Sequence, residues 1–141
     1  MTKRLLPLLL ICTVATAACV KKGPTEPETP EPTGFSSTFT GSMEGYNAAQ
    51  HSLTVPESGS LRARLTWTGG GDLDLYLTPG SCNTYPRQPG SGCELLEVSD
   101  RLEGSEEIIT RSVSSGDQFK IWVDSFSPEG IRNYTVVVTI D

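Results

Sequence analysis

Histidine is nearly absent from this sequence, because His51 is the only one in 141 residues. A hydrolase site of the Ser-His-Asp type would have to use it, yet no nucleophile-elbow motif lies near it. Catalytic zinc sites, which commonly take two or three histidines, also lack their ligands here. These absences argue against an enzyme, and we predict that His51 is a solvent-facing strand residue.

Positive charge is also scarce. The chain has 11 Lys and Arg against 17 Asp and Glu, which gives a net charge of −6. The first 18 residues contain Lys3 and Arg4 but no acidic residue, so the remainder has a net charge of 9 − 17 = −8. Lys and Arg supply most of the affinity for nucleic acids and for anionic lipid surfaces. The acidic balance therefore argues against nucleic acid as a partner and against docking on lipid through charge.

The chain lacks an apolar run long enough to span a bilayer. Its longest run, residues 5–14, contains Pro7 and has about ten residues, whereas a spanning helix needs roughly twenty. A basic start precedes this run, and the small residues 15–18 follow it. This three-part order is typical of a secretory signal peptide, so we expect residues 1–18 to direct export and then to be removed.

Residues 16–19, Thr-Ala-Ala-Cys, resemble the lipobox of bacterial lipoproteins. The resemblance implies cleavage before Cys19 and attachment of diacylglycerol to its sulfur, with acyl chains such as palmitate that hold the protein at a membrane. Val20, in place of Asp, resembles the sorting signal for the outer membrane, so we expect a periplasmic or surface-facing lipoprotein. Thr16 stands where the lipobox usually has Leu. The alternative is ordinary cleavage after Ala18 with a free thiol.

Residues 19–34 contain four prolines, three glutamates and no large apolar residue after Val20. Such a composition cannot bury a core, and proline together with like charges favours an extended chain. At ~3.1 Å per residue, about fifteen residues reach at most roughly 45 Å. We therefore predict a disordered tether that lifts a domain clear of a lipid surface.

From Phe35 onward, apolar and polar residues alternate with period two, in runs separated by clusters of Gly, Pro, Ser and Asp. Four matched apolar stripes must leave water together, and two antiparallel sheets packed face to face achieve this most simply. We predict one all-β domain over residues 35–141, an antiparallel β-sandwich. Strands are expected near residues 35–43, 50–55, 60–68, 72–78, 94–99, 106–113, 118–125 and 132–140. The stripes are Leu61, Ala63, Leu65 and Trp67; Leu73, Leu75 and Leu77; Phe119, Ile121 and Val123; and Tyr134, Val136, Val138 and Ile140.

Residues 71–77 read GDLDLYL, residues 116–123 read GDQFKIWV and residues 134–136 read YTV. Together with residues 41–61 and 65–67, they resemble the bacterial pre-peptidase C-terminal domain. The resemblance covers roughly residues 39–140 and implies a jelly-roll-like β-sandwich without catalytic residues. This family usually accompanies secreted peptidases, and some members bind calcium or collagen-like substrates. The present chain carries no peptidase and has an added cysteine loop.

Cys82 and Cys93 are the only cysteines in the predicted domain. In an oxidising compartment a disulfide is the default, and closing a loop of about a dozen residues stabilises a fold by about 3 kcal/mol. The spacing is not Cys-x-x-Cys, which argues against a redox motif. The loop is either a stapled insertion or a device that presents Tyr85, Arg87 and Gln88 to a partner.

Asp72 and Asp74 lie two residues apart and therefore project from one face of a strand. Two carboxylates with nearby loop carbonyls could ligate calcium, which takes six to eight oxygens, although no EF-hand-like loop is present. Alternatively, one carboxylate accepts hydrogen bonds from backbone N–H groups of the glycine turn at residues 69–71.

Tyr76 and Trp122 are out of phase with the core stripes. Exposed aromatic side chains stack on sugars or anchor protein partners, so these two, with Tyr85 and Arg87, are candidate ligand-binding residues. They are equally well explained if the cysteine loop or the tether covers them.

These features predict a non-catalytic binding or accessory module for protein or polysaccharide, held at a membrane through Cys19. The alternative is a calcium-binding module that stabilises part of the cell envelope. The fold alone does not give a function, so this prediction depends in part on the family resemblance.

Export and anchoring can be tested with a Cys19→Ser variant in the producing bacterium. We expect the wild-type chain in the membrane fraction, with mass spectrometry finding an acylated N-terminal Cys19. The variant, which lacks the sulfur that carries diacylglycerol, should move to the soluble fraction. A mature protein that retains residues 1–18 would contradict the prediction.

Overall fold

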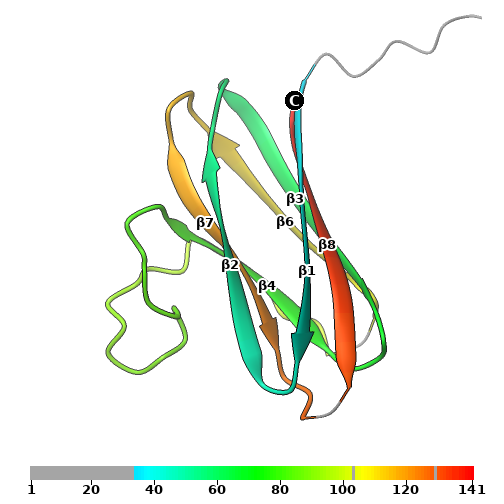
Figure 1. The fold of residues 1–141 in the computed structure, drawn as a ribbon. Helices are drawn as coiled ribbons and strands as arrows, with labels where there is room; N and C mark the ends of the chain where they lie inside the picture. The colour runs from blue at the N-terminus through cyan, green and yellow to red at the C-terminus, as the bar shows by residue number, and fades with distance from the viewer. Residues whose placement is uncertain (1–33, 103, 129) are drawn as a thin grey trace, which may run out of the picture. The chain divides into compact units, whose positions relative to one another are not determined.

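The computed structural model describes residues 34–102, 104–128 and 130–141, and the regular secondary structure in these ranges is entirely β-strand. All eight predicted strands are present, with bounds that differ from the predicted ones by a few residues. In chain order (Figure 1) they are β1 (Phe35–Glu44), β2 (Asn47–Thr54), β3 (Gly59–Thr68), β4 (Leu73–Pro79), β5 (Glu97–Ser99), β6 (Glu106–Val113), β7 (Gln118–Ser125) and β8 (Ile131–Ile140).

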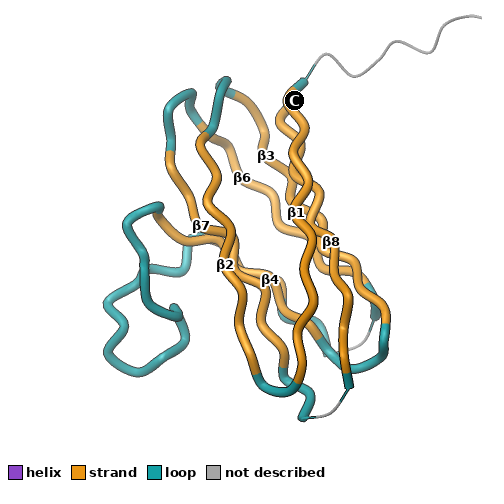
Figure 2. The backbone as a smooth tube through the Cα atoms, in the orientation of Figure 1, coloured by secondary structure: helices purple, strands orange, loops and turns teal. Residues whose placement is uncertain are grey.

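The strands form two four-stranded antiparallel sheets. The first sheet has the order β1-β8-β3-β6 and the second the order β2-β7-β4-β5. The chain crosses repeatedly from one sheet to the other, in the order of a jelly roll with two Greek keys, and Figure 2 shows the two layers face to face. The structure confirms the predicted all-β antiparallel sandwich and its jelly-roll arrangement.

The core between the sheets consists of the four predicted stripes. Every residue in those stripes is at most 7% exposed. Side chains alternate between the two faces of a strand, so the period-two pattern of each strand was enough to assign its inward side. The apolar run at residues 136–140 belongs to β8, which pairs with β1 on one side and β3 on the other.

Strand β4 is buried on both faces. All residues from Leu73 to Thr78 are buried, although alternate ones face away from the core. The cause is the segment 80–96, which stands out beside the second sheet in Figure 1 and packs on part of its outer face. Burial of this second face distinguishes β4 from the strands of the first sheet, where burial follows the alternation.

His51 does not face solvent, so that prediction was wrong. Its ring stacks on Phe39 with 4.9 Å between ring centroids, and its Nε2 lies 2.9 Å from the Tyr134 hydroxyl oxygen. Partial burial lowers the pKa of His51 below its ordinary value. The reason is register, because His51 shares its strand face with the buried Leu53.

The predicted signal peptide, Cys19 and most of the tether at residues 19–34 lie outside the described residues. Within the described ranges, no helix has the length and apolar character needed to cross a membrane.

A glycine at residue 41 is required by close packing across the first sheet. A Cβ atom added to Gly41 would lie 2.3 Å from the Tyr134 hydroxyl oxygen and 2.4 Å from Cζ of the same ring. The Gly41→Ala variant must displace Tyr134, which is 4% exposed and hydrogen-bonded to His51. We expect a loss of about 1–3 kcal/mol in unfolding free energy by urea denaturation. The neighbouring exposed Ser42→Ala should change it by less than about 0.5 kcal/mol; equal stabilities of the two variants would contradict this packing.

Candidate functional site

The segment 80–96 is closed by the predicted disulfide between Cys82 and Cys93. Cys82 is buried and Cys93 is partly buried against the outer face of the second sheet. The backbone N–H of Leu96 donates to the Leu77 carbonyl, which returns the chain to the sheet at the end of the loop. The disulfide therefore holds an insertion against the sandwich, as the stapled-insertion hypothesis predicted.

Tyr76 and Trp122 form a second hydrophobic cluster beneath this loop. They are neighbours across β4 and β7, and they are 0% and 5% exposed. The indole N–H of Trp122 donates to the Thr78 hydroxyl at 3.1 Å, and Tyr85 meets the indole edge-on with 6.1 Å between centroids. Of the two alternatives from sequence, the structure shows the covered one, so neither Tyr76 nor Trp122 is open to a ligand while the loop is in place.

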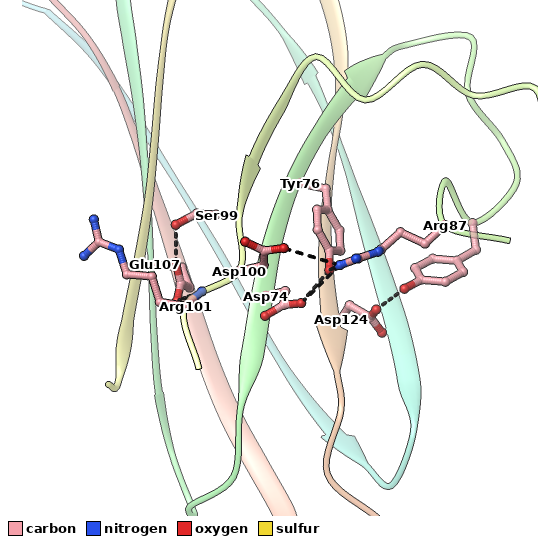
Figure 3. Close-up of polar contacts among 9 residues, drawn as sticks. Asp74, Tyr76, Arg87, Ser99, Asp100, Arg101, Glu107 and Asp124 are labelled. Carbon is pink, nitrogen blue, oxygen red and sulfur yellow. Dashed lines mark hydrogen bonds and ion pairs between the residues drawn. The ribbon is translucent and has the colours of Figure 1, made fainter. Parts of the chain in front are cut away.

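Arg87 extends from the loop back to the sheet (Figure 3). Its guanidinium donates to the Tyr76 hydroxyl at 2.6 Å and lies 3.6 Å from an Asp74 carboxylate oxygen and 3.8 Å from one of Asp100. It also lies over the rings of Tyr76 and Phe126, 5.3 Å and 5.7 Å from their centroids. Arg87 is thus a cation held by acids and aromatic rings of its own chain.

Asp74 is one of two buried carboxylates on this outer face. It is 4% exposed and accepts a hydrogen bond of 2.5 Å from the Tyr76 hydroxyl. Burial raises the pKa of Asp74 to about 6, with smaller upward effects from the acids Asp72, Asp100 and Asp124; the Tyr76 hydrogen bond opposes the rise.

Asp124 is the second buried carboxylate and pairs with Asp74 across β4 and β7. It is 6% exposed and accepts a hydrogen bond from the Tyr85 hydroxyl. Burial raises the pKa of Asp124, while the bond from Tyr85 favours the charged form. Burial also raises the pKa of both Tyr76 and Tyr85 above the ordinary value, so each hydroxyl keeps its proton and acts as a donor.

Two hollows flank Phe126 at the end of this face, beside the loop. The larger, of about 370 Å³, contains Asp124, and the smaller, of about 240 Å³, contains Asp74 and Arg87. Large apolar side chains stand exposed around them: Tyr46 at 71%, Phe126 at 45% and Leu102 at 90%. We call this region the Phe126 surface; it comprises Tyr46, Asn47, Ala48, Asp72, Asp74, Tyr85, Arg87, Asp100, Leu102, Asp124, Ser125 and Phe126.

A hollow of about 520 Å³ lies on the outer face of the first sheet, across β1, β8 and β3. Its polar side chains include Thr40, Ser42, Thr66, Thr68, Asn133 and Thr135. Neither a carboxylate nor a cationic side chain lines it. The Phe126 surface combines buried charge, exposed aromatic rings and concavity, and for that reason we regard it as the candidate site.

The surroundings of Asp74 do not suit a calcium ion. Its carboxylate already faces the guanidinium of Arg87 and accepts the Tyr76 hydroxyl, whereas calcium takes six to eight oxygens. In the described ranges, no group of three or more His, Cys, Asp or Glu side chains is arranged to hold a metal ion. Calcium binding at Asp72 and Asp74 thus stays a prediction from sequence without support from this geometry.

The glycine turn at residues 69–71 also differs from its predicted use. Its carbonyls accept bonds from the Trp67 indole and from Arg132, and no described contact joins its N–H groups to Asp72 or Asp74. The Asp72 backbone N–H donates to the Ser127 hydroxyl instead.

The four residues predicted to bind a ligand, Tyr76, Tyr85, Arg87 and Trp122, lie together on this outer face, and Asp74, predicted separately as a calcium ligand, lies beside them. Their binding role stays a prediction. Sequence reasoning missed the exposed ring of Phe126, together with Tyr46, Leu102, Asp100 and Asp124. A usable signal was present, since Asp-x-Tyr at residues 74–76 mirrors Trp-x-Asp at residues 122–124. In antiparallel strands these motifs pair acid with acid and ring with ring.

Solved structures share this fold at low sequence identity. Aeromonas hydrophila PliG, a periplasmic lysozyme inhibitor of g-type lysozyme, is 14% identical over 77% of this chain and 89% of its own, with a TM-score of 0.51. The Yersinia pseudotuberculosis-derived mitogen is 19% identical over 77% and 87%, with a TM-score of 0.52. The pre-peptidase C-terminal domain of a Bacillus anthracis collagenase is 14% identical over 71% and 87%, with a TM-score of 0.50.

No family model and no curated protein matches the sequence. At the identities above, the structural likeness shows the fold and not the function. The resemblance to the pre-peptidase C-terminal domain is confirmed as a shared jelly-roll sandwich.

The raised pKa of Asp74 makes stability depend on pH. Since the folded pKa of about 6 lies above the unfolded value of roughly 3.9, the native state binds more protons between these values and stability falls as pH rises through them. An Asp74→Asn variant has no carboxyl group at this position and therefore does not lose stability in this way as the pH rises. Its unfolding free energy relative to wild type should therefore rise by about 1–2 kcal/mol between about pH 4.5 and 6.5 in urea titrations.

The exposed Glu94→Gln variant is the control for a change of one charge and should show no such pH dependence. A difference between Asp74→Asn and wild type that stays constant across this pH range would contradict the assigned titration.

Proposed function

We propose that this chain is an exported, lipid-anchored binding module without catalytic activity, and that it contacts a protein partner through the Phe126 surface. The observation that carries the proposal is the exposure of Tyr46, Phe126 and Leu102 around two hollows that contain buried carboxylates. Exposed apolar groups clustered on a monomer mark interaction sites. Aromatic residues are the side chains that most often dominate the energy of protein interfaces.

Charge favours a basic partner. The residues 34–141 have seven Lys and Arg and fourteen Asp and Glu, a net charge of 7 − 14 = −7. Four of these acids, Asp72, Asp74, Asp100 and Asp124, belong to the Phe126 surface, and Arg87 is its only cation among the described residues. A negative surface speeds the encounter with positive partners and repels acidic ones.

The similar structures are compatible with a binding role. One of them is described as a periplasmic inhibitor of g-type lysozyme, and another as the pre-peptidase C-terminal domain of a collagenase. The residues of the Phe126 surface include no His, Cys or Lys, and the carboxylates of Asp74 and Asp124 are held by Tyr76, Arg87 and Tyr85. Both facts support binding in preference to catalysis.

Anchoring is the second part of the proposal. The lipobox-like residues 16–19 and the proline-rich residues 19–34 support a tether at the cell envelope. A polysaccharide ligand is the alternative, and the stacking rings of Tyr46 and Phe126 would suit sugars. The acids of the surface favour a basic protein over a neutral glycan.

In-cell cross-linking of the full chain tests this function. We expect wild type to yield defined cross-linked protein partners, and a Tyr46→Ser/Phe126→Ser double variant to reduce their yield by about tenfold or more, because both rings lose contact area. A Thr40→Ala/Thr66→Ala variant, on the outer face of the first sheet, is the control and should retain them. Equal loss in both variants, or full retention in the double variant, would overturn the proposal.

A further inference from the structure

The larger hollow of the Phe126 surface has an unusual lining. Three aromatic residues, Tyr46, Tyr85 and Phe126, surround it together with the buried carboxylate of Asp124. The remaining residues that line it are Asn47, Ala48 and Ser125. Aromatic faces carry negative potential and attract cations within about 6 Å, and a buried carboxylate strengthens that attraction.

A cation of the chain itself lies beside similar groups at the smaller hollow. The guanidinium of Arg87, which lines that hollow, lies 3.6 Å from the Asp74 carboxylate and 5.3 Å and 5.7 Å from the ring centroids of Tyr76, beneath it, and Phe126. Asp124 pairs with Asp74 across the two strands, and Phe126 belongs to both hollows. The two hollows therefore share Phe126, and each is lined by one of the two paired carboxylates, with Arg87 as the cation beside Asp74.

The hollow at Asp124 lacks a direct ion pair among the described residues, although the more distant charge of Arg87 and a hydrogen bond from the Ser125 backbone N–H favour the charged carboxylate. Arg87 makes its ion pairs with Asp74 and Asp100, and neither Lys nor Arg is among the residues that line this hollow. The bond that the Asp124 carboxylate accepts from a side chain comes from the neutral Tyr85 hydroxyl. A carboxylate that is 6% exposed without an ion pair is costly to keep charged, and a bound cation would offset that cost.

We propose that the hollow lined by Tyr46, Tyr85, Phe126 and Asp124 binds an organic cation, either an alkylammonium or a guanidinium group. Aromatic walls suit a large, weakly hydrated cation. Asp124 is the only carboxylate among the residues that line the hollow, whereas a calcium ion takes six to eight oxygens. The group belongs either to a small quaternary ammonium compound or to a Lys or Arg side chain of a protein partner. This inference rests on the proposed function in one respect: the hollow is part of the Phe126 surface, and the inference names the chemical group that this part recognises.

Ligand-observed NMR titrations of the full chain in a maltoside detergent test this site. The probes are choline, N-acetyl-arginine amide, N-acetyl-lysine amide and 3,3-dimethylbutanol, the uncharged isostere of choline. We expect at least one cation to bind about tenfold more tightly than the isostere, since only the cation interacts with the rings and with Asp124 through charge. Binding of choline alone assigns the site to a small quaternary ammonium compound, and binding of an amino-acid amide assigns it to a partner side chain.

Two variants locate the binding. Asp124→Asn keeps an oxygen that can accept the Tyr85 hydroxyl but removes the charge, and Phe126→Leu keeps an apolar side chain but removes the ring. Each variant should reduce the affinity for the cation by about fivefold or more. Glu94→Gln, which lies outside the hollow, should leave that affinity unchanged. Far-ultraviolet circular dichroism checks the fold, and Phe126→Leu remains informative if Asp124→Asn fails to fold.

The proposal is overturned if no cation binds, if the isostere binds equally well, if both variants bind as wild type does, or if millimolar calcium displaces the cation. Failure of the cation site can be distinguished from failure of the proposed function. Partner cross-linking that depends on Tyr46 and Phe126 without any cation binding would overturn the cation site alone. Cation binding without such cross-linking would overturn the protein-binding function alone.

Discussion

The pairing of β4 with β7 is the constraint on which the rest of this molecule depends. On the inward side it joins leucines to the isoleucine and valine of the core, as in any sandwich. On the outward side the same register sets Asp74 beside Asp124 and Tyr76 beside Trp122. The two large rings are more stable when buried, whereas the two carboxylates are more stable in water, so one sheet face cannot satisfy all four side chains in either environment. The loop with its disulfide, and Arg87 within it, resolves that conflict by covering the rings and neutralising one acid.

The strands and the core were predictable because the period-two pattern is local. For example, Leu61, Leu65 and Val138 can be assigned to the inward face because the residues two positions away in the sequence are also apolar. His51 was misjudged because polarity was given more weight than its position two residues before Leu53. The covering of Tyr76 and Trp122 was not predictable, since it depends on where a distant loop returns to the sheet. Phe126 was missed for a similar reason: it follows a strand end, where alternation no longer assigns a side.

The jelly-roll fold by itself says little about activity. A lysozyme inhibitor, a mitogen and the pre-peptidase C-terminal domain of a collagenase share it with this chain at no more than 19% identity. Such domains differ in the side chains on their sheet faces and in their loops. In this chain the distinguishing feature is the disulfide-closed segment 80–96, which covers part of an outer sheet face and creates a second, smaller buried region. Asp74, Asp124 and Arg87 lie at the border of that region, where charge is most strongly felt because water is partly excluded.

The direction of β1 separates the start of the described domain from the Phe126 surface. Phe35 opens this strand beside Ile140, while the turn that contains Tyr46 follows its other end. Ten residues at ~3.3 Å each place roughly 33 Å between the two ends. Residue 34 and the rings of Tyr46 and Phe126 therefore lie at opposite ends of the sandwich. A partner bound at those rings would contact the end of the domain that is remote from the start of β1.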